Sequence, residues 1–191
     1  MINAPRVSSE IWVRWRVRLG YPVALISFVL ARPTPSSLTI GTAIAALGLL
    51  VRGTAAGHLC KGERLAIWGP YAYTRNPLYL GSTLLAAGFV VATHSWSATA
   101  IVLGYFALFY PAVMRREEQE LRRSYGAAFD DYAARVPRFW PRLTRAGSSG
   151  GATGPGVRFT WERYSRNREY ESLLGSLAGI ALLWLRMHWR G

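Results

Sequence analysis

The sequence predicts an all-α fold: a polytopic membrane helical bundle with about four to five membrane helices and a cytoplasmic amphipathic helix. Two observations lead to this prediction. Of the 191 residues, 51% are hydrophobic, and they are gathered into long blocks. The charged residues lie between the blocks and are strongly biased toward Arg and Lys. A chain of this length holds one domain or a small bundle, so a single membrane unit is the simplest expectation.

Five hydrophobic blocks set the expected helices. A helix that crosses a bilayer needs roughly 20 mostly apolar residues, although Arg, Trp or Tyr at its ends shortens the strictly apolar part. The first and last blocks are short, so each is either a tilted or half-buried span or an arm of a hydrophobic hairpin. A buried helix of a soluble core is the alternative. The blocks are Leu19 to Ala31, Leu38 to Leu50 with an extension through Leu59, Leu78 to Thr93, Trp96 to Met114, and Leu173 to Leu185.

The basic residues predict the orientation of the bundle. The net charge of +13 would by itself also fit a nucleic-acid-binding protein. However, four Arg precede the first block, four basic residues lie within Arg52 to Arg75, and twelve lie within Arg115 to Arg168. Excess Lys and Arg mark cytoplasmic segments, and alternating the spans puts all three segments on one side. We therefore expect an integral, multi-pass membrane protein whose N-terminus and main polar loops are cytoplasmic, with membrane lipids as partners and no nucleic acid.

The N-terminus and the cysteine content add little. No small-residue cleavage site follows the first block, so no signal peptide is expected. The single Cys60 forms no internal disulfide and is expected to be inert.

Small and helix-breaking residues predict how the first helices connect. Two prolines make Arg32 to Ser37 a tight connection, so the first two helices are expected to form a hairpin. The spacing of Gly41, Ala45 and Gly48 places small residues on one face of the second helix, where a neighbour packs closely. Ordinary membrane-helix composition is the alternative explanation of this spacing.

A second hairpin is expected from the third and fourth helices, with a short turn near His94. Pro77 suits the first turn of the third helix, because its missing N–H would be unpaired there. Met114 marks the expected end of the fourth helix. An amphipathic helix should then run from Arg115 to about Arg135, interrupted near Gly126.

The remaining chain divides the protein. Two prolines exclude regular helix in Val136 to Pro141, and its aromatics favour the membrane interface. Ala146 to Gly156 is a flexible Gly/Ser-rich linker. Trp161 to Glu171 alternates basic and aromatic residues, as a helix lying on the membrane surface does. We expect a membrane domain at residues 1–145 and, at 146–191, the linker followed by an interfacial and hydrophobic helix.

The segment Gly69 to Gly81 concentrates polar chemistry where a loop enters a membrane helix. It holds two prolines, three tyrosines and Arg75. N–H groups at a helix start point outward with the positive end of the helix dipole, a favourable place for a carboxylate. An interfacial aromatic belt with turn residues is the alternative.

A second polar segment, Arg115 to Leu121, carries Glu117 and Glu118 at the end of a long apolar helix. Carboxylates beside a bilayer are costly unless they are paired or used. The alternative is a solvated helical face on which Glu118 pairs with Arg122 at i,i+4 spacing, a contact worth about a few tenths of a kcal/mol.

These two segments resemble the isoprenylcysteine carboxyl methyltransferase family and the related phospholipid methyltransferases. The first resembles the family signature of Gly-Pro-Tyr, Arg-His-Pro, Tyr and Gly. The second, with Gly126, Tyr132 and Val136 to Pro141, resembles the paired glutamates that precede a Gly- and Tyr-rich stretch and Val-Pro-Arg-Phe. The resemblance covers roughly Leu38 to Leu143.

The resemblance implies a helical membrane methyltransferase that uses S-adenosyl-L-methionine on the cytosolic side, with no metal. Its substrate would be a lipophilic small molecule or a lipid-modified group that arrives through the bilayer. Arg75 and Asn76 are then the expected catalytic residues, with Arg75 orienting an anionic group through a bidentate contact. Arg115 and Arg116 are the expected substrate-binding residues. The expected cofactor-binding residues are Glu63, Arg64, Leu65, Ala66, Tyr71, Asn76, Pro77, Leu78, Tyr79, Glu117 and Glu118.

Chemistry agrees with that assignment. A carboxylate accepts hydrogen bonds from ribose hydroxyls or an amino group, and aromatic faces attract a sulfonium. The five residues expected to meet at one cytosol-facing site are Tyr71, Arg75, Asn76, Tyr79 and Glu117.

The sequence departs from the family pattern at three places. Asn76 stands where the family usually has His, which removes a titratable group. Val113 stands where the eukaryotic carboxyl methyltransferases carry a substrate-binding Arg, and the chain after Arg145 extends past the usual family end. Because no His at position 76 is present to act as a base, we expect a methyl acceptor that is easily ionised, such as a carboxylate or thiol.

Two other functions remain open at this stage. A membrane NADPH-dependent reductase of the sterol type resembles the same Arg, Pro, Tyr signature, although the paired glutamates followed by Val-Pro-Arg-Phe favour the methyltransferase. A non-enzymatic lipid-binding membrane protein is the other alternative, and Asn76 and Val113 are its best support.

Overall fold

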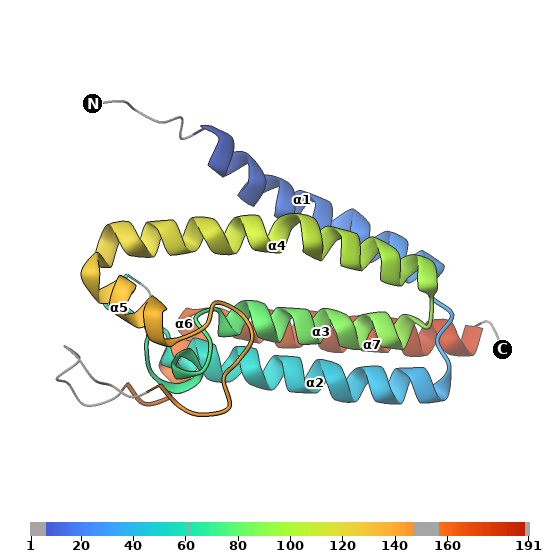
Figure 1. The fold of residues 1–191 in the computed structure, drawn as a ribbon. Coiled ribbons are helices and arrows are strands. Elements are labelled where there is room, and N and C mark those ends of the chain that lie inside the picture. The colour runs from blue at the N-terminus through green and yellow to red at the C-terminus, as the bar shows by residue number, and fades with distance from the viewer. Residues whose placement is uncertain (1–6, 61, 147–156, 190–191) are drawn as a thin grey trace.

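The computed structural model describes residues 7–60, 62–146 and 157–189 (Figure 1). Within these ranges the chain forms seven α-helices, one short 3-10 helix and no strand, which confirms the all-α class. The elements are α1 (Val7–Leu30), α2 (Pro35–His58), the 3-10 helix η1 (Gly69–Ala72), α3 (Pro77–Thr93), α4 (Trp96–Tyr125), α5 (Ala127–Arg135), α6 (Trp161–Arg166) and α7 (Glu169–Trp189).

The long helices form two layers (Figure 1). Helices α2, α3 and α7 pack together in one layer, and α1 packs on α4 in the other. One end of the bundle holds the loop between α2 and α3, the last turns of α4, and the whole of the short helices α5 and α6. We call residues 62–76, 115–146 and 157–168 the polar end. The C-terminal end of α7 lies at the opposite end of the bundle.

Glycines bring α2 and α3 into backbone contact. A Cβ added at Gly41 would lie 2.5 Å from the Gly88 carbonyl oxygen, and one added at Gly48 would lie 2.7 Å from the Gly81 carbonyl oxygen. No side chain fits in such a gap, so the two helices approach as closely as small residues allow. The predicted small-residue face of the second helix is confirmed, and Ala45 on the same face is buried.

The expected pairing of the first two helices is wrong. Their connection is tight as predicted, because α1 ends at Leu30 and α2 begins at Pro35, where Thr34 and Ser37 form a capping box. The helices then diverge: α1 lies along α4, while α2 lies along α3 and α7. The neighbour that packs on the small-residue face of α2 is α3.

The second hairpin forms with the predicted turn, but its second helix is longer than predicted. Pro77 begins α3, and α3 ends at Thr93, next to His94 in the left-handed conformation. Helix α4 does not end at Met114: it continues to Tyr125, so the apolar and amphipathic segments are one helix. The predicted interruption is confirmed at Gly126, whose φ of 52° separates α4 from α5.

Two of the described helices, α2 and α4, are long and apolar enough to cross a membrane. Arg18–Leu30 of α1 and Pro77–Thr93 of α3 are shorter apolar helices. The expected number of four to five membrane helices therefore remains a prediction.

The expected surface helix at Trp161 to Glu171 is divided, because α6 ends at Arg166 and α7 begins at Glu169, which is buried. The predicted linker lies, for residues 147–156, outside the described residues.

Candidate functional site

The two motif segments are hydrogen-bonded to each other at the polar end. The Arg75 N–H donates to the Pro137 carbonyl at 2.9 Å, and the Arg142 N–H donates to the Tyr73 carbonyl at 3.0 Å. Prolines keep this later segment out of helix, so its backbone groups are available for such contacts. The loop that starts α3 is therefore fixed against a segment more than 60 residues further along the chain.

Side chains of the same loop strengthen this connection. The Thr74 hydroxyl donates to the Phe139 carbonyl at 2.9 Å, and the Asn76 amide donates to the Arg138 carbonyl at 3.0 Å. Both side chains are buried. Asn76, at the position where the family resemblance expects His, thus contacts backbone of the second segment.

Glu118 is held between two arginines. Its carboxylate lies 3.3 Å from Arg75 and 2.6 Å from Arg138, and the Glu118 side chain is 8% exposed. The hydrogen bond to Glu118 raises the pKa of Arg138. The alternative pairing of Glu118 with Arg122 is wrong, because Arg122 pairs with Asp130 at 2.6 Å.

This cluster keeps unused hydrogen-bonding capacity. The Arg75 to Glu118 contact is an ion pair without hydrogen-bond geometry. Among the described residues, the buried Arg75 Nε and Glu118 Oε1 atoms make no hydrogen bond. Buried polar atoms are nearly always partnered, so such a pair suits contact with a polar ligand.

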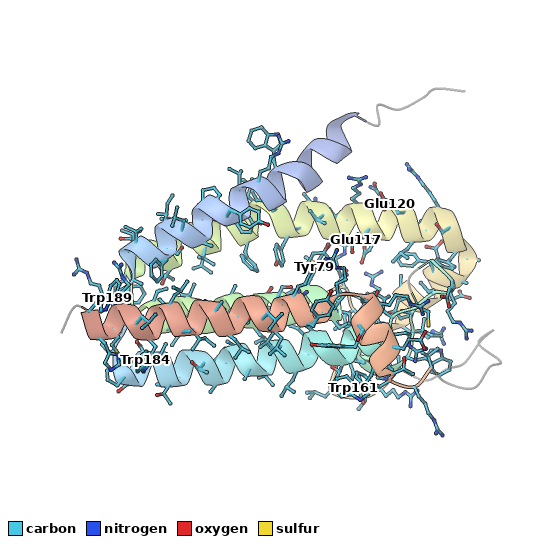
Figure 2. All side chains as sticks on the ribbon, turned by 180° about the vertical axis from the view of Figure 1, so that it is seen from behind. Tyr79, Glu117, Glu120, Trp161, Trp184 and Trp189 are labelled. Carbon is cyan, nitrogen blue, oxygen red and sulfur yellow. The ribbon has the colours of Figure 1, made fainter. Side chains whose placement is uncertain are left out.

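The neighbouring glutamate has a different environment. The Tyr79 hydroxyl on α3 donates to the Glu117 carboxylate on α4 at 2.7 Å, and Glu117 is exposed. Figure 2 shows both side chains between the two helices, near the start of α3. The Tyr79 ring meets the Tyr110 ring edge to face at 5.3 Å, and Tyr110 stacks on Phe106 at 4.1 Å. A carboxylate and a run of aromatic faces therefore lie together where α3 and α4 face each other.

A small buried core supports the site from the polar end. Phe129, Tyr132 and Val136 pack together, and the Tyr132 hydroxyl donates to the Tyr71 carbonyl at 2.7 Å. Burial raises the pKa of both Tyr71 and Tyr132. The Arg75 guanidinium lies over the Phe129 ring at 5.9 Å. Arg75 is thus placed by an aromatic face and by Glu118 at once.

The other predicted site residues lie in varied surroundings. Glu63 and Arg64 are exposed, and Glu63 pairs with Arg166 of α6 at 3.3 Å. Leu65 packs against the core at the polar end. Arg116 pairs with Glu120 at 2.9 Å. Of the others, Ala66 and Leu78 are half-buried, Pro77 is buried and Arg115 is exposed. Their binding roles stay predictions.

Sequence reasoning missed three residues of this arrangement: Thr74, Tyr132 and Arg138. All three lie inside the segments that carried the resemblance, so the motifs themselves were the available signal. The partner of Arg138, however, is 20 residues away on another helix. No local spacing predicts that contact.

Part of the chain matches a known protein family. Residues 36–128 match the family model described as phospholipid methyltransferase. This segment, residues 36–128 of the 191, belongs to the phospholipid methyltransferase family. This is the same membrane methyltransferase family that the motifs resembled, and its segment ends between Glu118 and Arg138.

Two curated relatives extend the likeness. A nickel-cobalt-cadmium resistance protein, NccN, from Alcaligenes xylosoxydans xylosoxydans is 36% identical over 139 residues, which are 68% of this chain and 64% of that protein. A cobalt-zinc-cadmium resistance protein, CzcN, from Cupriavidus metallidurans is 34% identical over 137 residues, which are 68% of this chain and 63% of that protein. The chain thus spans slightly less than two thirds of each relative. No solved structure matches it.

The names of these relatives concern metal resistance. Among the described residues of this chain, no group of three or more His, Cys, Asp or Glu side chains is placed to hold a metal ion.

Proposed function

We propose that this phospholipid methyltransferase family member transfers a methyl group from S-adenosyl-L-methionine to a lipophilic acceptor at the cytoplasmic face of a membrane. One observation carries the proposal: Tyr79 and Glu117 meet at 2.7 Å although 38 residues separate them, and the next residue of α4, Glu118, pairs with Arg75. The family match supplies the reaction class.

The residues at this site fit a zwitterionic cofactor. Glu117 is exposed and accepts from Tyr79, so it is available to amino or hydroxyl groups of a ligand. Arg75 and Glu118 each keep a buried atom without a hydrogen bond among the described residues. The rings of Tyr79 and Tyr110 present aromatic surface to a sulfonium.

When bound, S-adenosyl-L-methionine supplies an activated methyl group on a sulfonium. The protein then has to bind, orient and exclude water, and no side chain forms a covalent bond. Glu117 and Tyr79 bind the ligand from the two facing helices. Arg75, held by Glu118 and Phe129, orients an anionic group. Asn76 keeps the two motif segments together through the Arg138 carbonyl.

The acceptor we propose is a lipid-borne group that is already nucleophilic near neutral pH, such as an isoprenylcysteine-like carboxylate or a thiol. A carboxylate needs no general base, whereas an ammonium headgroup first loses a proton. Asn76 supplies no base at the position where the family resemblance expects His.

Binding of the cofactor product tests the role of Glu117. The variant Glu117→Gln keeps the size of the side chain and removes its charge, so the affinity for S-adenosylhomocysteine should fall about tenfold or more, as expected for a lost charged hydrogen bond. Glu120→Gln is the matched control, because Glu120 lies one turn further on α4 and pairs with Arg116 (Figure 2). Isothermal titration of the protein in lipid nanodiscs measures both affinities.

Three outcomes decide between the candidate functions. Loss of affinity in Glu117→Gln with an unchanged Glu120→Gln supports the site. Equal affinities of both variants for S-adenosylhomocysteine would mean that Glu117 is an ordinary residue of the helix surface. Absence of S-adenosylhomocysteine binding by the unaltered protein, with binding of NADPH instead, would favour a reductase and overturn the proposal.

Membrane topology tests the proposed location. The polar end carries most of the arginines, so we expect it to face the cytoplasm. The turn between α3 and α4, which holds His94, lies at the other end of the bundle and should face the opposite side (Figure 1). Single cysteines placed at Glu63, Arg123 and His94 in a Cys60→Ser background are labelled by a membrane-impermeant maleimide. Glu63 and Arg123 should react from the cytoplasmic side and His94 from the other. Labelling of Glu63 and Arg123 from opposite sides contradicts the shared site.

A further inference from the structure

An ion pair joins the C-terminal helix α7 to α2. Arg52 of α2 makes a bidentate contact with Glu169 of α7, at 3.0 Å from Nε and 2.6 Å from Nη2. Glu169 is buried, and Ser172 of α7 accepts a further hydrogen bond from Arg52 at 3.1 Å. A planar guanidinium suits this paired geometry and a Lys would not reproduce it. Helix α7 lies wholly beyond residues 36–128, which carry the family match.

The same arginine reaches the first turns of α3. Arg52 Nη1 donates to the Ser82 hydroxyl, and Ser82 in turn donates to the Leu78 carbonyl at 2.8 Å. Leu78 directly precedes Tyr79, which donates to Glu117. The stem of Arg52 passes over Gly81, where an added Cβ would lie 2.6 Å from the arginine Cγ. A path therefore runs from α7 through Arg52 of α2 to Ser82 by hydrogen bonds, then along the backbone of α3 from Leu78 to Tyr79, and by one more hydrogen bond to the glutamate on α4.

The charge of Glu169 acts on the same buried tyrosine as the charge of Glu117. The charges of both Glu117 and Glu169 contribute to raising the pKa of Tyr71, after the larger contributions of burial and Tyr132. The two carboxylates thus act on one buried phenol from different helices.

The far end of α7 is held by a second arginine. Arg186 Nε donates to the Ala31 carbonyl at 2.9 Å and its Nη2 donates to the Val29 carbonyl, while the guanidinium lies over Phe28 at 5.2 Å. With a rise of about 1.5 Å per residue, this contact lies about 25 Å along α7 from Glu169. The two ends of one helix are therefore fixed by similar chemistry, but only the Glu169 end is linked through Arg52 to Ser82 on α3.

We propose that Arg52 and Glu169 are positioning residues of the methyltransferase site: through Ser82 they set the first turns of α3, and with them the reach of Tyr79 to Glu117. The inference rests on the proposed function. Helix α7 then belongs to the working site, although it lies outside the segment that defines the family. Buried charges fix a register more strictly than apolar packing does, because a slipped pair leaves both partners unsatisfied.

Two pairs of matched variants test the proposal in the full chain in nanodiscs, with S-adenosylhomocysteine as the probe. Glu169→Gln is compared with Arg186→Gln, since each removes one fixed end of α7. Ser82→Ala is compared with Ser176→Ala, since Ser176 is a buried serine of α7 whose hydroxyl donates to the Ser172 carbonyl of the same helix. Unfolding temperature and dissociation constant are measured for each.

We expect Glu169→Gln and Ser82→Ala to weaken binding about three- to tenfold, the usual size of coupling through a packed network. Arg186→Gln and Ser176→Ala should keep the original dissociation constant, even where the unfolding temperature falls. The exchanged pair Arg52→Glu with Glu169→Arg should recover part of the affinity lost in Arg52→Glu alone.

Three results overturn the proposal. If Glu169→Gln and Ser82→Ala bind as tightly as the unaltered protein, the ion pair is structural only. If Arg186→Gln loses as much affinity as Glu169→Gln, the effect is general destabilisation. If the unaltered protein binds no S-adenosylhomocysteine, the proposed function fails first, and this inference fails with it.

Discussion

The two sides of α3 are held in different ways. On one side α3 contacts α2 backbone to backbone, through glycines that leave no room for a side chain. On the other side α3 reaches α4 through long side chains, with Tyr79 bonded to Glu117 and packed on Tyr110. Backbone contact is rigid because nothing in it changes rotamer, whereas a contact between long side chains adjusts to a ligand. The α2 contact is therefore a fixed scaffold, which we call the scaffold side of α3. The α4 contact can adjust to a ligand, and we call it the adaptable side.

The scaffold side should tolerate substitution least. In Gly88→Leu the new side chain meets the Ala45 nitrogen, which lies only 2.5 Å from an added Cβ, so α2 and α3 must move apart. We expect a loss of more than about 3 kcal/mol in the free energy of unfolding. Gly104→Leu on α4 is the control, because nothing lies within 4 Å of its added Cβ. Unfolding in detergent titrations compares the two, and a stable Gly88→Leu protein would refute the rigid contact.

The second largest loss of stability is expected in the charged cluster around Glu118. Glu118→Gln leaves Arg75 and Arg138 without their shared carboxylate, and we expect a loss of about 2 to 3 kcal/mol, as for a broken buried pair. Glu120→Gln removes an exposed pair with Arg116 and should cost at most about 0.5 kcal/mol. The same detergent titration measures both. Equal small losses would mean that the Glu118 cluster is solvated and does not fix Arg75.

The buried tyrosines at the polar end should give the smallest effect. Tyr132→Phe removes the hydrogen bond to the Tyr71 carbonyl, with an expected cost of about 1 kcal/mol. Burial raises the pKa of Tyr132 above its ordinary value of 10.0, so the neutral phenol is favoured in the folded state. This contribution to stability is complete below about pH 10 and is lost as the pH rises further. Unfolding temperatures from pH 8 to 11 should therefore fall less steeply in Tyr132→Phe, and parallel curves would contradict the assignment.

Much of the fold follows from local features of the sequence. Pro77 begins α3 because a residue without an N–H costs nothing in a first helical turn, and Gly126 separates α4 from α5 because it adopts a positive φ. The face of Gly41, Ala45 and Gly48 could be predicted from spacing alone, since helical periodicity places those residues together. Two prolines likewise excluded helix from the segment that binds the loop before α3.

Pairings between distant elements could not be predicted in this way. Spacing alone allowed Glu118 to pair with Arg122 one turn away, but in the fold Glu118 pairs with Arg75 and Arg138. The attraction between charges is stronger there because the Glu118 carboxylate is buried. Similarly, the short connection after Leu30 suggested a hairpin, but α2 packs its glycine face on α3, and α1 lies on α4.

The sequence by itself determined the helical class, the start of α3 at Pro77, the break at Gly126, and the family to which residues 36–128 belong, because each depends on neighbouring residues or on a linear motif. The tertiary structure alone decided which glutamate is held by arginines and which meets a tyrosine, and that Arg52 of α2 bonds both α7 and α3. The physical reason is that helical periodicity fixes which face a residue occupies, while the choice of partner depends on which helices approach closely enough for a buried charge to be neutralised.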